Sequence, residues 1–200
     1  MAKFNERPPV FRWDNYINDE RLLTRSGTSP CLCEVNETMK NLILLRHAKS
    51  SWDEPALSDF DRPLNNRGKK AAPIIGKLMK ERQLKPDLIL CSPSKRTKQT
   101  AKLVLDSAKL DLDVTFDKGI YEASTSKLLN ILKSQEATAE SILMIGHNPG
   151  LEDLLTELTG CHEHFPTAAL ANIVLDIENW KGIKYGAGEL KWIVRPKEIS

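Results

Sequence analysis

Arginine and histidine residues stand at three separate points of the sequence, each shortly after a run of apolar residues. Arg46 and His47 directly follow one run, Arg96 follows a second run after a Ser-Pro step, and His147 follows a third. The planar guanidinium group of arginine matches two phosphate oxygens at once. This combination of residue types predicts a phosphoryl-binding site, provided that folding brings the three points together.

The elements that must position these residues are short strands and longer helices. Apolar runs predict strands over 41–45, 87–91, 114–116, 141–145, 170–175 and 190–194, and helical periodicity predicts helices over 67–83, 94–109, 124–135 and 151–159. This alternation predicts an α/β fold, a three-layer α/β/α arrangement around a mostly parallel sheet. The last two strands, with no helix between them, are expected to add an antiparallel edge. Pro73 is expected to limit the first helix or to start its regular part.

The site is expected at the carboxyl ends of the strands, because ligands of open α/β sheets bind in the crevice beyond those ends. If the first, second and fourth strands are parallel, two arginines and two histidines meet at one rim. The helices that follow these strands also present unpaired N–H groups and a positive field to the same crevice. An anion of phosphate size would be held there from several sides.

Three motifs, in this order along the chain, resemble the signature of the histidine phosphatase superfamily, also called phosphoglycerate mutase-like. They are Leu44-Leu45-Arg46-His47-Ala48, the segment 91–101 that contains Arg96, and Gly146-His147-Asn148-Pro149-Gly150. The last motif, and the segment 59–64 followed by Arg67-Gly68, are similar to the SixA-type phosphohistidine phosphatase branch. The resemblance covers roughly residues 41–195, and three ordered motifs are far more specific than one.

The resemblance implies a metal-independent phosphatase of phosphoglycerate mutase-like fold that needs no cofactor. His47 would be the nucleophile, forming a phosphohistidine intermediate that water then hydrolyses. Arg46, Arg96 and His147 would hold the three equatorial oxygens of the phosphoryl group and replace the metal ion that other phosphatases use. The implied partner is a phosphorylated substrate, either phosphohistidine in a protein or a small phosphoester.

Four further residues are candidates for the same site. Glu122, after the third strand, could protonate the leaving group, although a phosphohistidine ring that already carries a proton needs such a donor less. Ser50, Arg62 and Asn148 are expected to contribute to substrate binding. Loop solvation explains Ser50 almost as well, Arg62 could instead anchor its loop, and Asn148 could cap the helix from residue 151.

Two rival functions remain open on these residues. One is a phosphomonoesterase of broad specificity, and the other is a phosphate-binding module that recognises phosphorylated partners without turnover. Mutase activity is less favoured, because a mutase must shield its intermediate from water and the chain has no obvious covering insertion.

The composition is that of a soluble globular protein. The 200 residues carry a net charge of +2, 40% are hydrophobic, and no apolar stretch is long enough to span a bilayer, so no membrane partner is expected. The segment 62–102 is rich in Lys and Arg, which could attract an anion. Trp52, Trp180 and Trp192 are expected to be packing residues rather than a platform for bases, so no nucleic-acid partner is expected.

The cysteines predict neither a disulfide framework nor a metal site. Cys31 and Cys33 together with the segment 161–164 suggest zinc ligands, but their spacings match no strong zinc pattern. Residues 1–39 are expected to be a partly ordered N-terminal extension and residues 40–200 the catalytic domain. That extension has neither the apolar core of a secretory signal nor the acid-poor composition of a transit peptide. We therefore expect a cytoplasmic protein with reduced thiols, an organelle being the alternative.

Overall fold

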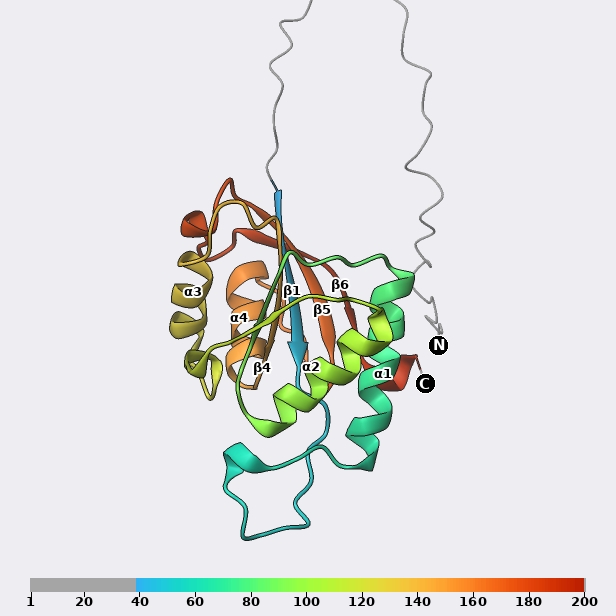
Figure 1. Cartoon of the computed structure of the whole chain (residues 1–200). Coiled ribbons are helices and arrows are strands. Elements are labelled where there is room, and N and C mark those ends of the chain that lie inside the picture. The colour runs from blue at the N-terminus through green and yellow to red at the C-terminus, as the bar shows by residue number, and fades with distance from the viewer. Residues whose placement is uncertain (1–38, 200) are drawn as a thin grey trace, which may run out of the picture. The chain divides into compact units, whose positions relative to one another are not determined.

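Six of the apolar runs form one sheet in the computed structural model, which describes residues 39–199 (Figure 1). The strands are β1 (Met39–Arg46), β2 (Leu88–Cys91), β3 (Val114–Phe116), β4 (Ser141–Gly146), β5 (Leu170–Asp176) and β6 (Gly188–Val194). Their order is β3-β2-β4-β1-β5-β6. The strands β1 to β4 run parallel, whereas β5 and β6 join as antiparallel strands beyond β1. The predicted mostly parallel sheet with an antiparallel edge is confirmed.

Helices cover both faces of this sheet, as a mostly parallel sheet requires. Over residues 39–199 the α-helices are α1 (Asn66–Glu81), α2 (Lys95–Ala108), α3 (Thr125–Lys133) and α4 (Gly150–Thr159). Figure 1 shows α1 and α2 on one face and α3 and α4 on the other. Alternate residues of β1 face the two sides: Ile43 and Leu45 pack in one hydrophobic cluster, and Leu42 and Leu44 in the other. The predicted three-layer α/β/α fold is confirmed.

Short 3-10 helices lie in the connections. They are η2 (Asp59–Asp61) between β1 and α1, η3 (Lys118–Ile120) between β3 and α3, η4 (Trp180–Gly182) between β5 and β6, and η5 (Pro196–Glu198) after β6. The long connection that contains η2 lies beyond the carboxyl end of β1 (Figure 1). It therefore borders the crevice where the sequence places the site.

The start of α1 packs closely against the loop that follows β1. Asn65 caps α1, its side chain accepting a hydrogen bond of 2.9 Å from the backbone N–H of Gly68. A Cβ atom at Gly68 would lie 2.2 Å from the backbone oxygen of Lys49. Only glycine allows this approach, which ties α1 to the segment just after His47.

Pro73 neither limits α1 nor starts its regular part, so that expectation was wrong. The helix runs without a break from Asn66 to Glu81 with Pro73 inside it. The missing N–H costs one helical hydrogen bond, but α1 packs tightly on α2. A Cβ atom at Gly76 would lie 2.3 Å from the backbone oxygen of Val104. The helix is thus packed closely on α2 within one turn of the proline.

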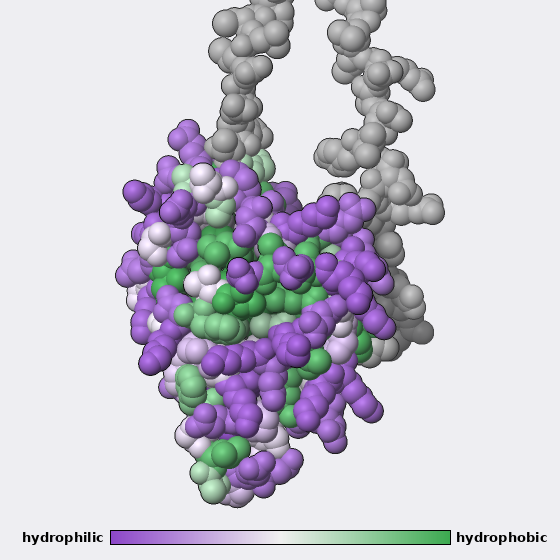
Figure 2. Space-filling model, in the orientation of Figure 1, coloured by the Kyte–Doolittle hydropathy of each residue, from purple (hydrophilic) through white to green (hydrophobic). Residues whose placement is uncertain are grey.

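The surface in view is mostly hydrophilic, with a band of hydrophobic residues across its middle (Figure 2). In the part of the chain that the structure describes, no helix combines the length and apolar character needed to cross a bilayer.

Candidate active site

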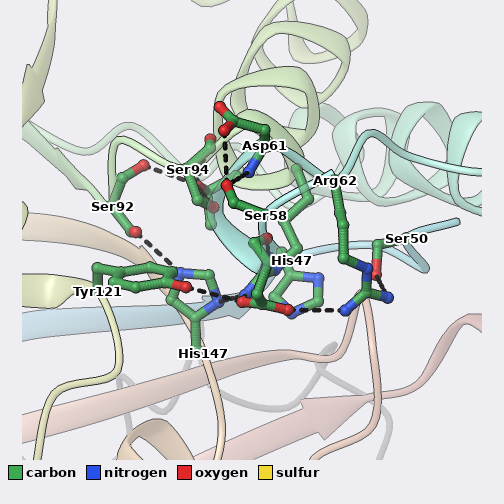
Figure 3. Close-up of polar contacts among 12 residues, drawn as sticks. His47, Ser50, Ser58, Asp61, Arg62, Ser92, Ser94, Tyr121 and His147 are labelled. Carbon is green, nitrogen blue, oxygen red and sulfur yellow. Dashed lines mark hydrogen bonds and ion pairs between the residues drawn. The ribbon is translucent and has the colours of Figure 1, made fainter. Parts of the chain in front are cut away.

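Segments from three parts of the chain meet beyond the carboxyl ends of β1, β2 and β4. His47 follows β1, His147 follows β4, and Arg96 lies in the first turn of α2 after β2. The ring centroids of His47 and His147 are 5.0 Å apart. The Nη2 atom of Arg96 is 3.3 Å from Nδ1 of His147. Figure 3 shows the two imidazoles side by side, with Tyr121 next to His147 and with Arg62 and Ser50 beyond His47.

The sheet register explains why the two histidines meet. In the parallel pair of β1 and β4, the last residue of β1, Arg46, lies opposite the last residue of β4, Gly146. The histidines that follow the two strands are therefore at the same level. The backbone N–H of His47 continues the ladder by donating to the oxygen of Gly146 at 3.1 Å. Both side chains are buried, with less than a tenth of their surface exposed.

His47 is held in one tautomer by its neighbour. Its Nδ1 lies 2.8 Å from the backbone oxygen of Ala48. A carbonyl oxygen can only accept, so Nδ1 carries the proton and Nε2 keeps a free lone pair. Burial lowers the pKa of His47 to about 4, and the positive charges of Arg96 and Arg46 act in the same direction. At neutral pH this imidazole is uncharged, with one nitrogen free to attack.

His147 is also neutral, with its tautomer set by two partners. Its Nε2 lies 2.8 Å from Oγ of Ser92, and its Nδ1 faces the guanidinium of Arg96. Because Arg96 can only donate, Nδ1 accepts and Nε2 carries the proton. The pKa of His147 is lowered to about 3, mainly by burial and further by His47 and Arg96. An anion bound between these groups would make protonation of His147 more favourable.

Arg46 brings a second guanidinium group to the site. Its Nη1 donates to the backbone oxygen of Phe165 at 2.9 Å, whereas its Nε is buried without a hydrogen-bond partner. Burial lowers the pKa of Arg46 from its usual value, and Glu152 partly offsets this, but a guanidinium remains charged at neutral pH. A buried N–H without an acceptor costs free energy, which a bound oxyanion could recover.

Asp59, at the start of η2, joins these groups although the sequence did not single it out. Its Oδ2 accepts from Nη2 of Arg96 and from the hydroxyl of Tyr121, each at 2.8 Å. Its Oδ1 accepts from Nη1 of Arg62 at 2.7 Å, and its backbone oxygen accepts from Nη1 of Arg96. Burial alone would raise the pKa of Asp59, but hydrogen bonds from Tyr121, Arg96 and Arg62 outweigh it and hold this pKa well below its usual range.

Arg62 and Ser50 lie at the edge of the site, where their contacts are with the protein. Arg62 donates through Nε to the backbone oxygen of Ser51 at 2.9 Å, and through Nη2 to Oγ of Ser50 at 2.9 Å. With Asp59 as the third acceptor, each nitrogen of the guanidinium has a protein partner. The anchoring role expected as the alternative for Arg62 is what these contacts describe, and direct substrate binding by either residue stays a prediction.

For Asn148 and Glu122 the structure records no hydrogen bond to either imidazole. Asn148 donates from Nδ2 to Glu152 at 2.8 Å and to the backbone oxygen of Phe165 at 2.9 Å, and its Oδ1 is buried without a partner. The N-cap of α4 is Pro149, so Asn148 is not the cap. Glu122 is exposed, with a positive φ of 47°. Its role as proton donor stays a prediction.

Three polar residues of the site were missed by sequence reasoning. Asp59 lies in the segment that resembles the SixA-type branch, Tyr121 is the neighbour of Glu122, and Ser92 begins the Ser-Pro step before Arg96. Their positions next to recognised residues were the available signal. Burial and a hydrogen bond to Asp59 raise the pKa of Tyr121 to about 12, so its hydroxyl stays a donor.

The prediction that the tryptophans are packing residues fails for Trp52. Trp180 is fully buried and Trp192 is partly buried, but Trp52 is 72% exposed. Trp52 lies in the loop between β1 and η2, which provides no core for it to enter. Its position beside Arg62 places it at the edge of the site.

Within residues 39–199, no group of three or more His, Cys, Asp and Glu side chains has an arrangement that could hold a metal ion. Of the cysteines considered for zinc, Cys161 is exposed, and Cys31 and Cys33 lie outside the described residues.

Comparison with known proteins places this geometry in a family. Residues 42–141 match the sequence model of the histidine phosphatase superfamily (branch 1). The chain is 30% identical over 151 residues to an uncharacterised chloroplast protein of Arabidopsis thaliana, an alignment that covers 71% of this chain and 69% of that protein.

Solved structures show the same fold. The candidate phosphohistidine phosphatase SixA of Agrobacterium tumefaciens superposes with a TM-score of 0.68 at 30% identity, covering 78% of this chain and 98% of that one. The candidate SixA of Nakamurella multipartitia superposes with a TM-score of 0.70 at 24% identity, covering 79% of this chain and 96% of that one. The chain therefore belongs to the histidine phosphatase superfamily, in its SixA-type branch, and is a phosphatase.

Proposed function

We propose that this phosphatase removes the phosphoryl group from phosphohistidine in a protein, with His47 as nucleophile. The observation that carries the proposal is the tautomer of His47. Its Nδ1–H is fixed on the oxygen of Ala48, which leaves Nε2 as an unprotonated nucleophile in a buried, positively charged pocket. The resemblance of the solved SixA structures supports the choice of substrate class.

In the first step, Nε2 of His47 attacks phosphorus and the bond to the leaving group breaks. The electron pair of that bond goes to the departing ring nitrogen of the substrate. If the other ring nitrogen of the substrate already carries a proton, the leaving group departs as neutral imidazole. This substrate needs no separate acid in the first step.

In the second step, water attacks the phosphorus of the phosphohistidine at residue 47. The bond between phosphorus and Nε2 breaks, and its electron pair returns to the ring. The oxygen of the attacking water becomes part of inorganic phosphate, and one proton of that water is released to solvent. Charge on the equatorial oxygens is met by Arg46, Arg96 and His147, whose positions are fixed before the reaction. The two guanidinium cations, together with His147 once the bound anion favours its protonation, thus stabilise both transition states.

The test is to trap the intermediate. Brief incubation with a phosphohistidine peptide labelled at phosphorus, followed by denaturation, should leave an acid-labile label on the peptide that contains His47. The variant His47→Asn should carry no label and show no turnover. A label on another residue, or full turnover by His47→Asn, would contradict the proposal.

The two rival functions are separated by turnover measurements. A binding module would bind phosphate without turnover, and a broad phosphomonoesterase would hydrolyse nitrophenyl phosphate at least as well as the peptide. A SixA-type enzyme should prefer the phosphohistidine peptide by kcat/KM.

The cytoplasmic location expected from the sequence stays a prediction, which fractionation of the source cells would test.

A further inference from the structure

The indole of Trp52 is exposed at the edge of the active site. A single exposed hydrophobic side chain is ordinary on a protein surface, and Tyr185 is 71% exposed in a connection elsewhere. Exposure alone therefore says nothing about Trp52. Its fixed position and the cavity beside it carry the inference.

Trp52 is held in place from one side. The guanidinium carbon of Arg62 lies 3.1 Å from the centroid of the indole ring, in cation–π geometry. Arg62 is itself buried and fixed through Ser50, Ser51 and Asp59. The ring is thus a prearranged flat surface, covered by Arg62 on one face and largely open elsewhere.

A cavity of about 290 Å³ lies beside this ring. It is lined by Trp52, Glu54, Pro55, Leu57, Asp59 and Arg62. Asp59 also accepts a hydrogen bond from Arg96, which approaches His147, so the cavity shares a wall with the phosphoryl site. A leaving group that extends from the phosphoryl site past Asp59 would enter this cavity.

The chemistry of the lining selects the kind of leaving group. Trp52, Pro55 and Leu57 offer apolar surface to a flat ring. Glu54 adds a carboxylate, whereas the opposite charges of Asp59 and Arg62 are paired with each other. Such a pocket favours a ring with N–H donors or positive charge and disfavours an anionic leaving group.

We propose that Trp52 is the platform on which the leaving ring of the substrate stacks, an inference that rests on the proposed function. The ring that fits is the imidazole of phosphohistidine, with its proton facing the carboxylate of Glu54. Trp52 touches the leaving group and not the transferred phosphoryl group. It therefore determines specificity, while the arginines and histidines bind phosphate.

The experiment compares Trp52→Ala with the wild type on two probes. The KM for a phosphohistidine peptide should rise roughly tenfold, since stacking on an aromatic ring contributes about this much. The inhibition constant of tungstate, which probes only the phosphoryl pocket, should stay within about twofold. Trp52→Phe should recover most of the loss, and the control Tyr185→Ala, an equally exposed aromatic residue, should match the wild type.

Two results would overturn the inference. If tungstate inhibition weakens in parallel with KM, Trp52 only supports Arg62 and Asp59. If neither value changes, the ring has no role in binding.

Should the wild type fail to hydrolyse the peptide, the proposed substrate is wrong. The same comparison is then made on nitrophenyl phosphate against acetyl phosphate, because only the first has a ring to stack, and an equal KM change on both would reject the platform.

Discussion

The two histidines share a pocket with the guanidinium groups of Arg46 and Arg96, and this keeps both imidazoles neutral. Burial removes the water that would stabilise an imidazolium ion, and the nearby positive charges add repulsion. The fixed hydrogen bonds then decide which nitrogen carries the proton. The folded protein thus keeps Nε2 of His47 unprotonated, as the proposed nucleophile requires, at the cost of holding two basic groups uncharged.

This cost predicts that acid destabilises the protein well above pH 4. The pKa values of His47 and His147 are about 4 and 3 in the folded state, against about 6.5 in the unfolded chain. Between those values only the unfolded chain binds the protons, so the free energy of unfolding falls as pH falls below 6.5. For His47 the loss amounts to roughly 3 kcal/mol by pH 4.

Urea unfolding at pH 7, 5.5 and 4.5 measures this effect. The variant His47→Asn should lose less stability than the wild type over the same range, because one of the two buried bases is gone. Equal pH slopes for the variant and the wild type would contradict the lowered pKa of His47.

Asp59 places a negative charge next to the cation that is expected to bind phosphate. Its carboxylate is 2.8 Å from Nη2 of Arg96, with 41% of the side chain exposed. Asp59→Asn keeps the shape and removes the charge, so inorganic phosphate should inhibit the variant about fivefold more strongly, a difference of about 1 kcal/mol after solvent screening. Competitive inhibition constants measure this.

The control for this variant is Asp61→Asn. It removes the same charge from the same short helix, where Asp61 accepts a hydrogen bond from Ser58. Phosphate inhibition should be nearly unchanged in this control. Weaker phosphate binding by Asp59→Asn would mean that the carboxylate is needed to orient Arg96.

At the scale of elements, two glycines in α1 bring this helix against different parts of the protein. A Cβ at Gly68 would collide with the backbone of Lys49 at 2.2 Å, in the segment that follows His47, whereas a Cβ at Gly76 would collide with the backbone of Val104 in α2 at 2.3 Å. Each alanine should destabilise the fold by about 1–3 kcal/mol, the usual cost of overpacking.

The two variants should differ in activity. Gly68→Ala pushes on the segment that follows His47 and should lower kcat at a temperature where both variants are folded. Gly76→Ala strains only the contact between α1 and α2 and should keep kcat near the wild-type value. Measurements of melting temperature and kcat on both variants separate the effects, and unchanged kcat in Gly68→Ala would show that the loop absorbs the collision.

The elements themselves were predictable, because they depend on local patterns. Apolar runs of strand length, and the Arg, His and Ser-Pro residues directly after them, identify both the sheet and the rim where His47, Arg96 and His147 meet. The partners of Arg96 were not predictable in this way. Asp59 is 37 residues away from Arg96, and Tyr121 is 62 residues away from Asp59. Sequence periodicity does not indicate which residue of a loop lies near the end of a strand. The exposure of Trp52 was not predictable for the same reason, because Trp52 lies in the same connection.

At the scale of the whole molecule, the order of strands explains why the site can be both buried and assembled from distant segments. Strand β4 lies between β1 and β2, so the ends of these three strands are neighbours. An anion bound to Arg46, Arg96 and His147 would connect β1, α2 and β4. Such a ligand binds only the folded chain, and it therefore stabilises the entire sheet.

Tungstate should accordingly raise the melting temperature of the protein. At a concentration of 100 times its dissociation constant, the gain in stability is about 2.7 kcal/mol, which corresponds to several degrees. Arg96→Ala removes one of the two guanidinium groups and should abolish most of the shift. Arg82→Ala is the matched control. Arg82 caps the carboxyl end of α1, whereas the start of this helix packs on the segment after His47. The guanidinium carbon of Arg82 lies 4.2 Å from the ring centroid of Trp192. The shift should persist in this control. A full shift in Arg96→Ala would mean that tungstate binds elsewhere, because an anion held in this pocket would bind more weakly once Arg96 was removed.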